Sequence, residues 1–355
     1  MQHSGAPDHK ARAERPAFRV REAVPGDNAA LLALDRQCVM AAATPVMFDR
    51  SPDFFARSRP YAYWRAYVAE SEQGLIGVAA MALKTVLVRG RRVRAAYFYD
   101  LRVAPEFRRL GVAKAMGDAL REHTRALAPT VVYSLVMEGN VPSHSFVEAR
   151  GSRPLRPGTL CLIPLEAVPA ADPQRVRLLE ASEIPAALSL AGAAHPDQDL
   201  FPFPDAASLV ERIDRLVQIG YLGLYGWEAD GALAGCFGLW DYGQVMRMRV
   251  LRQSGEWAWA GGRDLNLVFL MPLGFRDAEG VAEAIRLAAA RVRQEPAVGA
   301  ACVLAIPHDL EAPGYTALDA FRPLRLAFDV FGLDLGEPSY HTIGTRPVFV
   351  DPADL

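Results

Sequence analysis

Residues 101–114 have the types and spacing that could bind an anion. An apolar strand ends at Pro105, Arg108 and Arg109 follow, and a helix is expected to begin near Gly111. The start of a helix exposes unpaired backbone N–H groups, and glycine lets a ligand approach the backbone closely. The stretch therefore predicts a phosphate site. The alternative is an ordinary strand-to-helix turn with solvated arginines.

Two common phosphate-binding motifs do not fit this stretch. A Walker-type loop ends in Gly-Lys-Ser/Thr, and a dinucleotide fingerprint needs three spaced glycines in a βαβ unit. Only Gly111 is present, and residues 65–103 predict three antiparallel strands instead. The elements expected after the glycine are a helix, a strand, a short helix and a strand, over residues 113–127, 130–138, 141–150 and 158–168.

The same stretch resembles motif A of the GNAT superfamily of acyl-CoA-dependent N-acetyltransferases. The matching residues are Leu101-Arg102-Val103-Ala104-Pro105 and then Arg108-Arg109-Leu110-Gly111-Val112-Ala113. The order of the flanking elements also fits, and the resemblance covers roughly residues 17–165. It implies an α+β fold, in which a mixed, mostly antiparallel central sheet is flanked by helices.

The resemblance implies how acetyl-CoA would be held. Backbone N–H groups of residues 109–114 would bind the pyrophosphate, and Leu101 and Val103 would pair with the pantetheine arm at a point where two strands splay apart. Asn140 stands where the family often has an asparagine that contacts the cofactor. The implied cofactor-binding residues are Leu101, Arg102, Val103, Arg108, Arg109, Leu110, Gly111, Val112, Ala113, Lys114 and Asn140.

The sequence departs from the family pattern at the general acid. Many members have a tyrosine seven residues after the asparagine, where this chain has Val147, and Gly151 is followed by Ser152 rather than by an aromatic residue. His144 is the catalytic candidate because its ordinary pKa suits proton transfer. A solvent-facing His144 and protonation of the thiolate by water are the alternatives. Other candidates nearby are Tyr133, Ser143 and Ser145.

Asp100 is the candidate base, because attack requires a neutral amine. There are two alternatives to this role. Asp100 would bind a cationic amine, or it would pair with Arg102 or another arginine at the strand end. Glu138, on the neighbouring strand, is a weaker candidate. A group of aromatic residues falls where the family builds its acceptor wall, although aromatic residues are more commonly core. These are Phe54, Phe55, Tyr61, Tyr63 and Trp64.

The second half of the chain echoes the first. The segment from Arg177 resembles that from Arg19, and the segment from Trp227 resembles that from Val68, in the same order. This predicts two tandem GNAT-like domains, with two unrelated α/β domains as the alternative. The predicted divisions are a disordered tail at 1–16, a catalytic domain at 17–166, a linker at 167–175 and a degenerate domain at 176–355.

The second copy of the anion motif carries acids. Aligning Phe107 with Phe275 places Asp277 opposite Arg109 and Glu283 opposite Lys114. The second loop also has one extra residue. Carboxylates at this position repel phosphate. The second domain is therefore predicted not to bind coenzyme A, and to pack on the first domain or complete the acceptor cleft.

The composition narrows the class of protein. The 355 residues carry a formal net charge of −2, which disfavours a broadly basic nucleic-acid binder. The four cysteines are far apart, the seven histidines show no metal-ligand spacing, and no apolar run suits a membrane span or a signal peptide. We expect a cytoplasmic protein without a metal, nucleic-acid or membrane partner. Its oligomeric state stays open, a homodimer included.

The hypothesis from sequence is an enzyme. It would transfer acetyl from acetyl-CoA to a primary amine by direct attack in a ternary complex, since no covalent nucleophile is evident. The alternative is a non-catalytic coenzyme-A sensor or interaction module. The acceptor stays open among aminoglycosides, polyamines, amino acids, small metabolites, protein N-termini and hydroxyl compounds.

Overall fold

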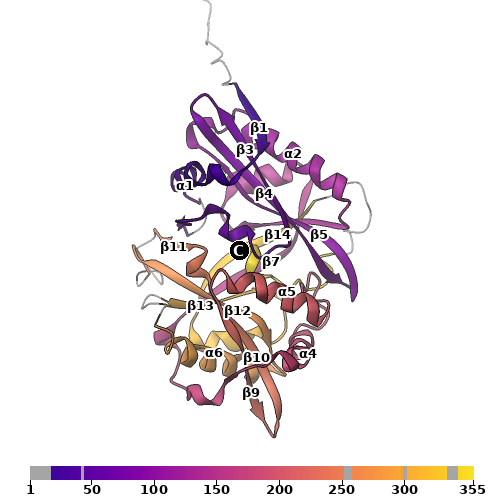
Figure 1. The fold of residues 1–355 in the computed structure, drawn as a ribbon, viewed down its shortest axis with the longest axis vertical. Coiled ribbons are helices and arrows are strands. Elements are labelled where there is room, and N and C mark those ends of the chain that lie inside the picture. Colours follow the sequence, from indigo (N-terminus) through magenta and orange to yellow (C-terminus); the bar gives the residue numbers. More distant parts are fainter. Residues whose placement is uncertain are drawn as a thin grey trace, which may run out of the picture.

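The computed structural model describes residues 17–40, 44–251, 258, 260–296, 298, 302–333 and 343–355. The predicted disordered tail at 1–16 lies outside the described residues. The first half of the chain forms the upper part of the molecule in Figure 1 and the second half the lower part. No helix in the parts of the chain described is both long and apolar enough to cross a membrane.

The first half contains the strands and helices expected from its sequence, together with β2, which was not expected. In chain order they are β1 (Phe18–Glu22), α1 (Asn28–Gln37), β2 (Val46–Asp49), β3 (Tyr63–Ser71), β4 (Gly74–Val88), β5 (Arg91–Val103), α2 (Val112–Leu127), β6 (Val131–Met137), α3 (Val141–Glu148) and β7 (Ser152–Pro164). Helix α2 buries Val112, Met116, Leu120 and Thr124, which lie four residues apart on one helical face. This face packs against the sheet and fixes where the helix begins.

The second half repeats this series. Its elements are β8 (Arg177–Leu178), α4 (Ile184–Ala194), α5 (Ala206–Val217), β9 (Tyr221–Ala229), β10 (Ala232–Asp241), β11 (Arg247–Val250), β12 (Asp264–Gly274), α6 (Ala278–Val292), β13 (Cys302–Asp309) and β14 (Leu324–Leu333). Helix α6 follows β12 as α2 follows β5. In both halves the strand before this helix pairs in parallel with the strand after it.

The two halves share one mixed sheet. Its strand order is β1-β3-β4-β5-β6-β14-β7-β13-β12-β10-β9-β8, so the halves run inward from opposite edges in the same order. The predicted fold class is confirmed. The sequence did not indicate that β14 lies between β6 and β7, or that β7 lies between β14 and β13. The predicted division near residues 167–175 therefore separates the halves along the chain, while their strands interleave in space.

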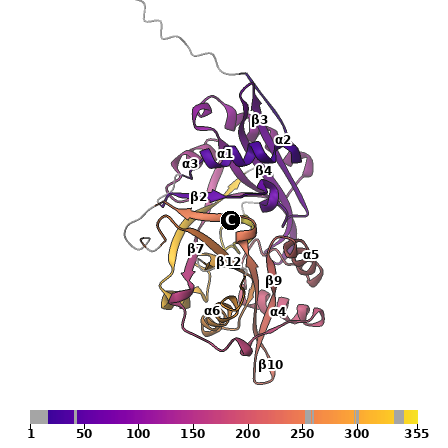
Figure 2. The same ribbon diagram turned by 60° about the vertical axis from the view of Figure 1, so that its left-hand side comes forward.

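The last described segment lies between the halves, where both views place the C-terminal end (Figures 1 and 2). Lys84 in β4 donates to Asp351 at 2.9 Å and to Asp354 at 2.8 Å. Arg212 in α5 donates to Asp351 at 3.2 Å. Because these charges are buried, removing one partner would leave the other uncompensated. The network thus fixes the segment against both halves.

Candidate active site

Strands β5 and β6 diverge at the centre of the first half. Their parallel pairing runs from Ala95–Val131 to Phe98–Ser134 and stops, although β5 continues to Val103. Asp100 has a φ of 55°, and the register with β4 shifts at the same place, which is a β-bulge. The bulge turns the end of β5 away from β6. Strands β5 and β6 therefore spread apart here, as the family resemblance implies.

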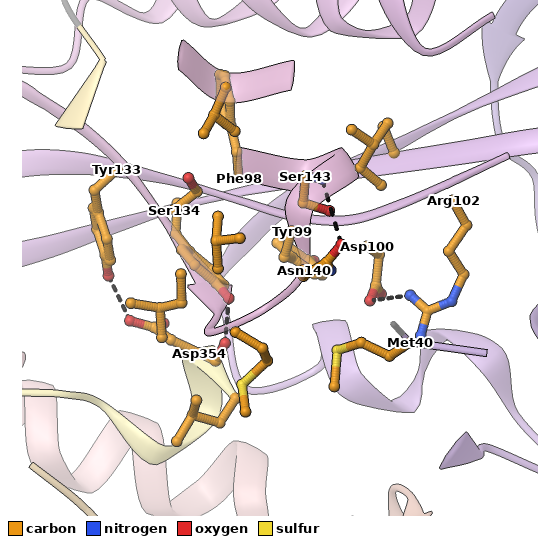
Figure 3. A pocket seen from close by; sticks show the side chains of 18 of the residues that line it. Met40, Phe98, Tyr99, Asp100, Arg102, Tyr133, Ser134, Asn140, Ser143 and Asp354 are labelled. Carbon is orange, nitrogen blue, oxygen red and sulfur yellow. Dashed lines mark hydrogen bonds and ion pairs between the residues drawn. The ribbon is translucent and has the colours of Figure 1, made fainter. Parts of the chain in front are cut away.

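A cavity of about 230 Å³ opens where the strands diverge. Figure 3 shows side chains that line it. One side lies under α2 and α3 and is lined mainly by apolar side chains, namely Phe98, Leu120, Val132, Phe146 and Val147. The other side is built by both halves of the chain. Such a mostly apolar cavity with a few polar groups is typical of small-molecule sites.

The loop before α2 has the geometry expected of a phosphate cradle. Gly111 is the N-cap of α2 with a φ of 91°, and no side chain caps the helix. Its missing Cβ would point into open space. The loop therefore presents backbone N–H groups to solvent at the positive end of the helix dipole. Arg109 is exposed beside it, with a φ of 65°.

The other expected cofactor residues fall into two groups. Leu101, Val103, Leu110 and Ala113 are half-buried along the diverging strand and the loop, while Val112 is buried in the core. Several charged side chains are already paired. Arg102 turns toward Asp35 and Asp100, Lys114 pairs with Asp118 at 2.7 Å, and Arg108 donates to the Val103 carbonyl at 3.2 Å. The Arg102 side chain is thus engaged by Asp35 and Asp100.

Asn140 caps α3, because its side chain accepts a hydrogen bond from the backbone N–H of Ser143 at 3.3 Å. Asn140, Ser143 and Val147 all line the cavity. His144 is not among the described lining residues. Its Nε2 lies 3.3 Å from the Met137 carbonyl, and its ring packs on Phe331 of β14. The structure thus brings His144 to the shared sheet rather than to the cavity.

The structure also places the remaining general-acid candidates, which are Ser145, Tyr133 and Ser143. Ser145 is exposed on the helix. Tyr133 lines the cavity, but its hydroxyl donates to Asp354 at 2.5 Å, and burial together with the Asp354 charge holds its pKa well above the ordinary value. Ser143 lines the cavity, and its hydroxyl makes no hydrogen bond to another described residue.

Asp100 is held by a cluster of buried arginines. Arg50 donates to its two oxygens at 2.6 and 2.7 Å, Arg57 at 2.5 Å and Arg102 at 3.1 Å. Burial alone would raise the pKa of Asp100, but the charges of Arg50 and Arg57 hold it well below its usual range. A carboxylate so engaged is a poor proton acceptor. The geometry favours the paired alternative, and Glu138 is exposed.

Sequence analysis did not single out Arg50 or Arg57. They lie in the irregular region around β2 and the short 3₁₀ helix Phe54–Ser58, where no spacing indicates a shared partner. The aromatic residues expected to form the acceptor wall are absent from the described cavity lining. Phe54 and Tyr61 are each 3 % exposed and belong to the core. The aromatic residues that do line the cavity are Tyr97, Phe98, Tyr99, Tyr133, Phe146, Tyr242, Phe48 and Phe269.

The second half shows a filled version of the same site. Pairing of β12 with β13 stops at Phe269–Ala305, although both strands continue. Tyr315 stacks on His308 of β13 with ring centroids 4.5 Å apart and meets Phe275 edge-on. The Asp277 side chain accepts from the Gly280 N–H at 2.9 Å and caps α6. Protein groups thus occupy both the anion position and the gap.

Comparison with known proteins agrees with this geometry. Residues 30–151 match the acetyltransferase (GNAT) family. This stretch of the first half is therefore similar to a GNAT acetyltransferase domain. No curated protein matches the chain. Among the described residues there is no group of three His, Cys, Asp or Glu side chains that could hold a metal ion.

Similar solved structures show the fold of the whole chain. A tandem GNAT protein from the clavulanic acid biosynthesis pathway has a TM-score of 0.58 at 14% identity, covering 90% of this chain and 99% of that one. A GCN5-related N-acetyltransferase from Sphaerobacter thermophilus has a TM-score of 0.57 at 15% identity, covering 89% of this chain and 95% of that one. Saccharomyces cerevisiae N-myristoyltransferase with bound myristoyl-CoA has a TM-score of 0.61 at 12% identity, covering 90% of this chain and 80% of that one. The chain thus has a tandem GNAT fold.

Proposed function

We propose that this protein transfers an acetyl group from acetyl-CoA to a primary amine, with the active site in the first half of the chain. The observation that carries the proposal is the open divergence of β5 and β6, with a cavity at its apex and an uncapped helix N-terminus at Gly111 beside it. Residues 109–114 would bind the pyrophosphate, and the exposed edge of Leu101–Val103 would pair with the pantetheine arm.

The reaction would be direct. The amine nitrogen would attack the thioester carbonyl, a C–N bond would form, and the C–S bond would break as the thiolate leaves. The amine proton would pass to solvent, and the thiolate would take a proton from water, directly or relayed through the Ser143 hydroxyl. No covalent enzyme intermediate is needed, because a ternary complex would hold the amine against the thioester carbonyl.

A non-catalytic coenzyme-A sensor is the second candidate. The observation that favours it is Val147, which lines the cavity where many family members have a proton-donating tyrosine. Thiol leaving groups tolerate the absence of an acid, since a thiol has a pKa of about 8.5. Transfer therefore remains the better-supported function.

Measuring the free thiol released from acetyl-CoA in the presence of primary amines distinguishes the transferase from the sensor. We expect coenzyme A to form only when an amine is added, with the acetylated amine as product by mass spectrometry. Binding of acetyl-CoA by calorimetry without release of thiol across the amines would support the sensor instead. Failure to bind acetyl-CoA would overturn both.

A further inference from the structure

The cavity has two sides, and the position of the phosphate cradle indicates which of them coenzyme A would occupy. Gly111, Asn140 and Ser143 all belong to the loops and helix ends on the α2 and α3 side of the sheet. A coenzyme A held there would reach the divergence of β5 and β6 from that side. An amine must approach the thioester carbonyl from a different direction. The side built by both halves is therefore left for the acceptor.

The second half supplies several apolar residues to that second side. Met246, Met248, Leu267 and Phe269 are each at most 3 % exposed and line the cavity. Met40 comes from the first half and points into the cavity in Figure 3. Methionine is flexible and polarisable, so it adapts to irregular apolar ligands.

The carboxylate side chains on this side are already neutralised. Asp100 and Asp354 are the carboxylate side chains among the described lining residues. Asp100 is bound by three arginines, and Asp354 accepts from Lys84, Tyr61 and Tyr133. A polyamine or an aminoglycoside would bring several cations to a wall whose one carboxylate without an ion pair among the described residues is the terminal group of Leu355. Burying unpaired charges is costly, so this side does not suit a polycation.

One polar group in the wall, the Tyr242 hydroxyl, is left without a hydrogen-bond partner, although its ring packs against Trp240 and Phe269. The Tyr242 side chain, 1 % exposed, lines the cavity, and its hydroxyl lies near Arg57 without a partner in hydrogen-bonding geometry among the described residues. The Nε of Arg57 is likewise unpartnered there. A buried polar group normally has a partner. A ligand N–H would give the hydroxyl that partner.

We infer that the acceptor is a monoamine with an apolar body, held between the walls of the two halves, with its nitrogen near Tyr242. This inference rests on the proposed function and names the substrate class of the same site. The second half would then determine acceptor specificity although its own anion loop is closed.

A series of amines tests the substrate class on the full chain. The probes are 2-phenylethylamine, hexylamine, ethanolamine and spermidine, with acetyl-CoA as donor. We expect kcat/KM for the first two to exceed that for ethanolamine by roughly tenfold or more, because added apolar groups bind in an apolar pocket. Spermidine should be poorest. A flat series, or spermidine as the best substrate, would overturn the inference.

Variants of the wall test the site. Met248→Ala should raise KM for 2-phenylethylamine about fivefold or more and leave KM for acetyl-CoA unchanged, and Tyr242→Phe should raise the same amine KM severalfold. Met81→Ala is the matched control, since Met81 is fully buried in the first half and is not a lining residue. It should lower stability without changing either KM.

Two further measurements separate this inference from the proposed function. If Met248→Ala changed the preference between acetyl-CoA and hexanoyl-CoA instead of the amine KM, this side would hold the acyl chain, and the inference would be wrong. If no amine led to thiol release, calorimetry of 2-phenylethylamine binding to the coenzyme-A-saturated protein would decide whether the amine pocket exists. Binding that Met248→Ala weakens would retain the pocket while the transferase proposal fails, and no binding would overturn the pocket too.

Discussion

The two divergences in the shared sheet have the same topology and different contents. At β5 and β6 the gap is a cavity, and the helix that follows begins at Gly111 with its N-terminus uncapped. At β12 and β13 Tyr315 and His195 fill the corresponding region, and Asp277 caps α6. One duplicated motif thus gives an open ligand site in one half and a packed core in the other.

The difference shows how little sequence change closes a site. The aspartate at the second loop supplies the negative charge that a phosphate would supply, so the helix N-terminus is satisfied within the protein. Tyr315 then packs in the space between the strands. The prediction that the second half does not bind coenzyme A has this physical basis, and the experiments below test it.

The largest effect should follow from emptying the filled gap. Tyr315→Ala removes a 6 % exposed ring that stacks on His308 and meets Phe275, so we expect a loss of about 3–5 kcal/mol in the free energy of unfolding. Chemical denaturation measures it. Tyr67→Ala, at a half-buried ring, should cost much less. Gain of a second coenzyme-A site in Tyr315→Ala would show that the ring alone keeps the site closed.

The buried histidine should make the filled half sensitive to acid. Burial lowers the pKa of His195 to about 4, despite its hydrogen bond to the Leu273 carbonyl at 3.0 Å. The unfolded histidine has a pKa of about 6.5, so the unfolded state takes up a proton first as pH falls. Stability should be full above pH 6.5 and fall by about 3 kcal/mol by pH 4.

His195→Gln is the control for this prediction, because glutamine keeps a donor for the carbonyl and does not titrate. The difference in unfolding free energy between the two proteins, measured from pH 7 to pH 4, isolates the histidine from the carboxylates. A constant difference across this range would contradict a buried neutral His195.

The open loop should be the more sensitive of the two to a bulky residue. Gly111→Trp places a side chain where φ is 91° and where a phosphate would approach. We expect acetyl-CoA affinity to fall by about 100-fold, which corresponds to about 2.7 kcal/mol. Gly280→Ala, the aligned position in the second loop, should leave affinity unchanged. Calorimetry showing intact binding in Gly111→Trp would remove the cradle assignment.

The smallest effect concerns the cap of the closed loop. Asp277→Ala removes the acceptor for the Gly280 N–H and should cost about 1 kcal/mol of unfolding free energy. It should not create a coenzyme-A site, because Tyr315 still fills the gap. A new site in this variant would mean that the carboxylate, and not the packing, excludes the ligand.

Sequence reasoning predicted the elements of the first half other than β2, the internal repeat and the anion loop. These depend on local properties, namely strand alternation, the spacing of apolar residues in α2 and a glycine at a position of positive φ. It did not predict the insertion of β14 between β6 and β7, since the pairing of strands far apart in the chain has no local signal. Val147 was identified as a departure, and the structure places it in the cavity wall.

The sequence by itself determined the fold class, the tandem repeat and which of the two loops carries cations. Those features follow from the residue order within short segments. Only the tertiary structure decided that Asp100 is neutralised by Arg50 and Arg57, that His144 faces β14, and that residues of both halves enclose the cavity. Burial and charge pairing arise from residues distant in sequence, so the chemistry of the site is fixed only after the halves have packed.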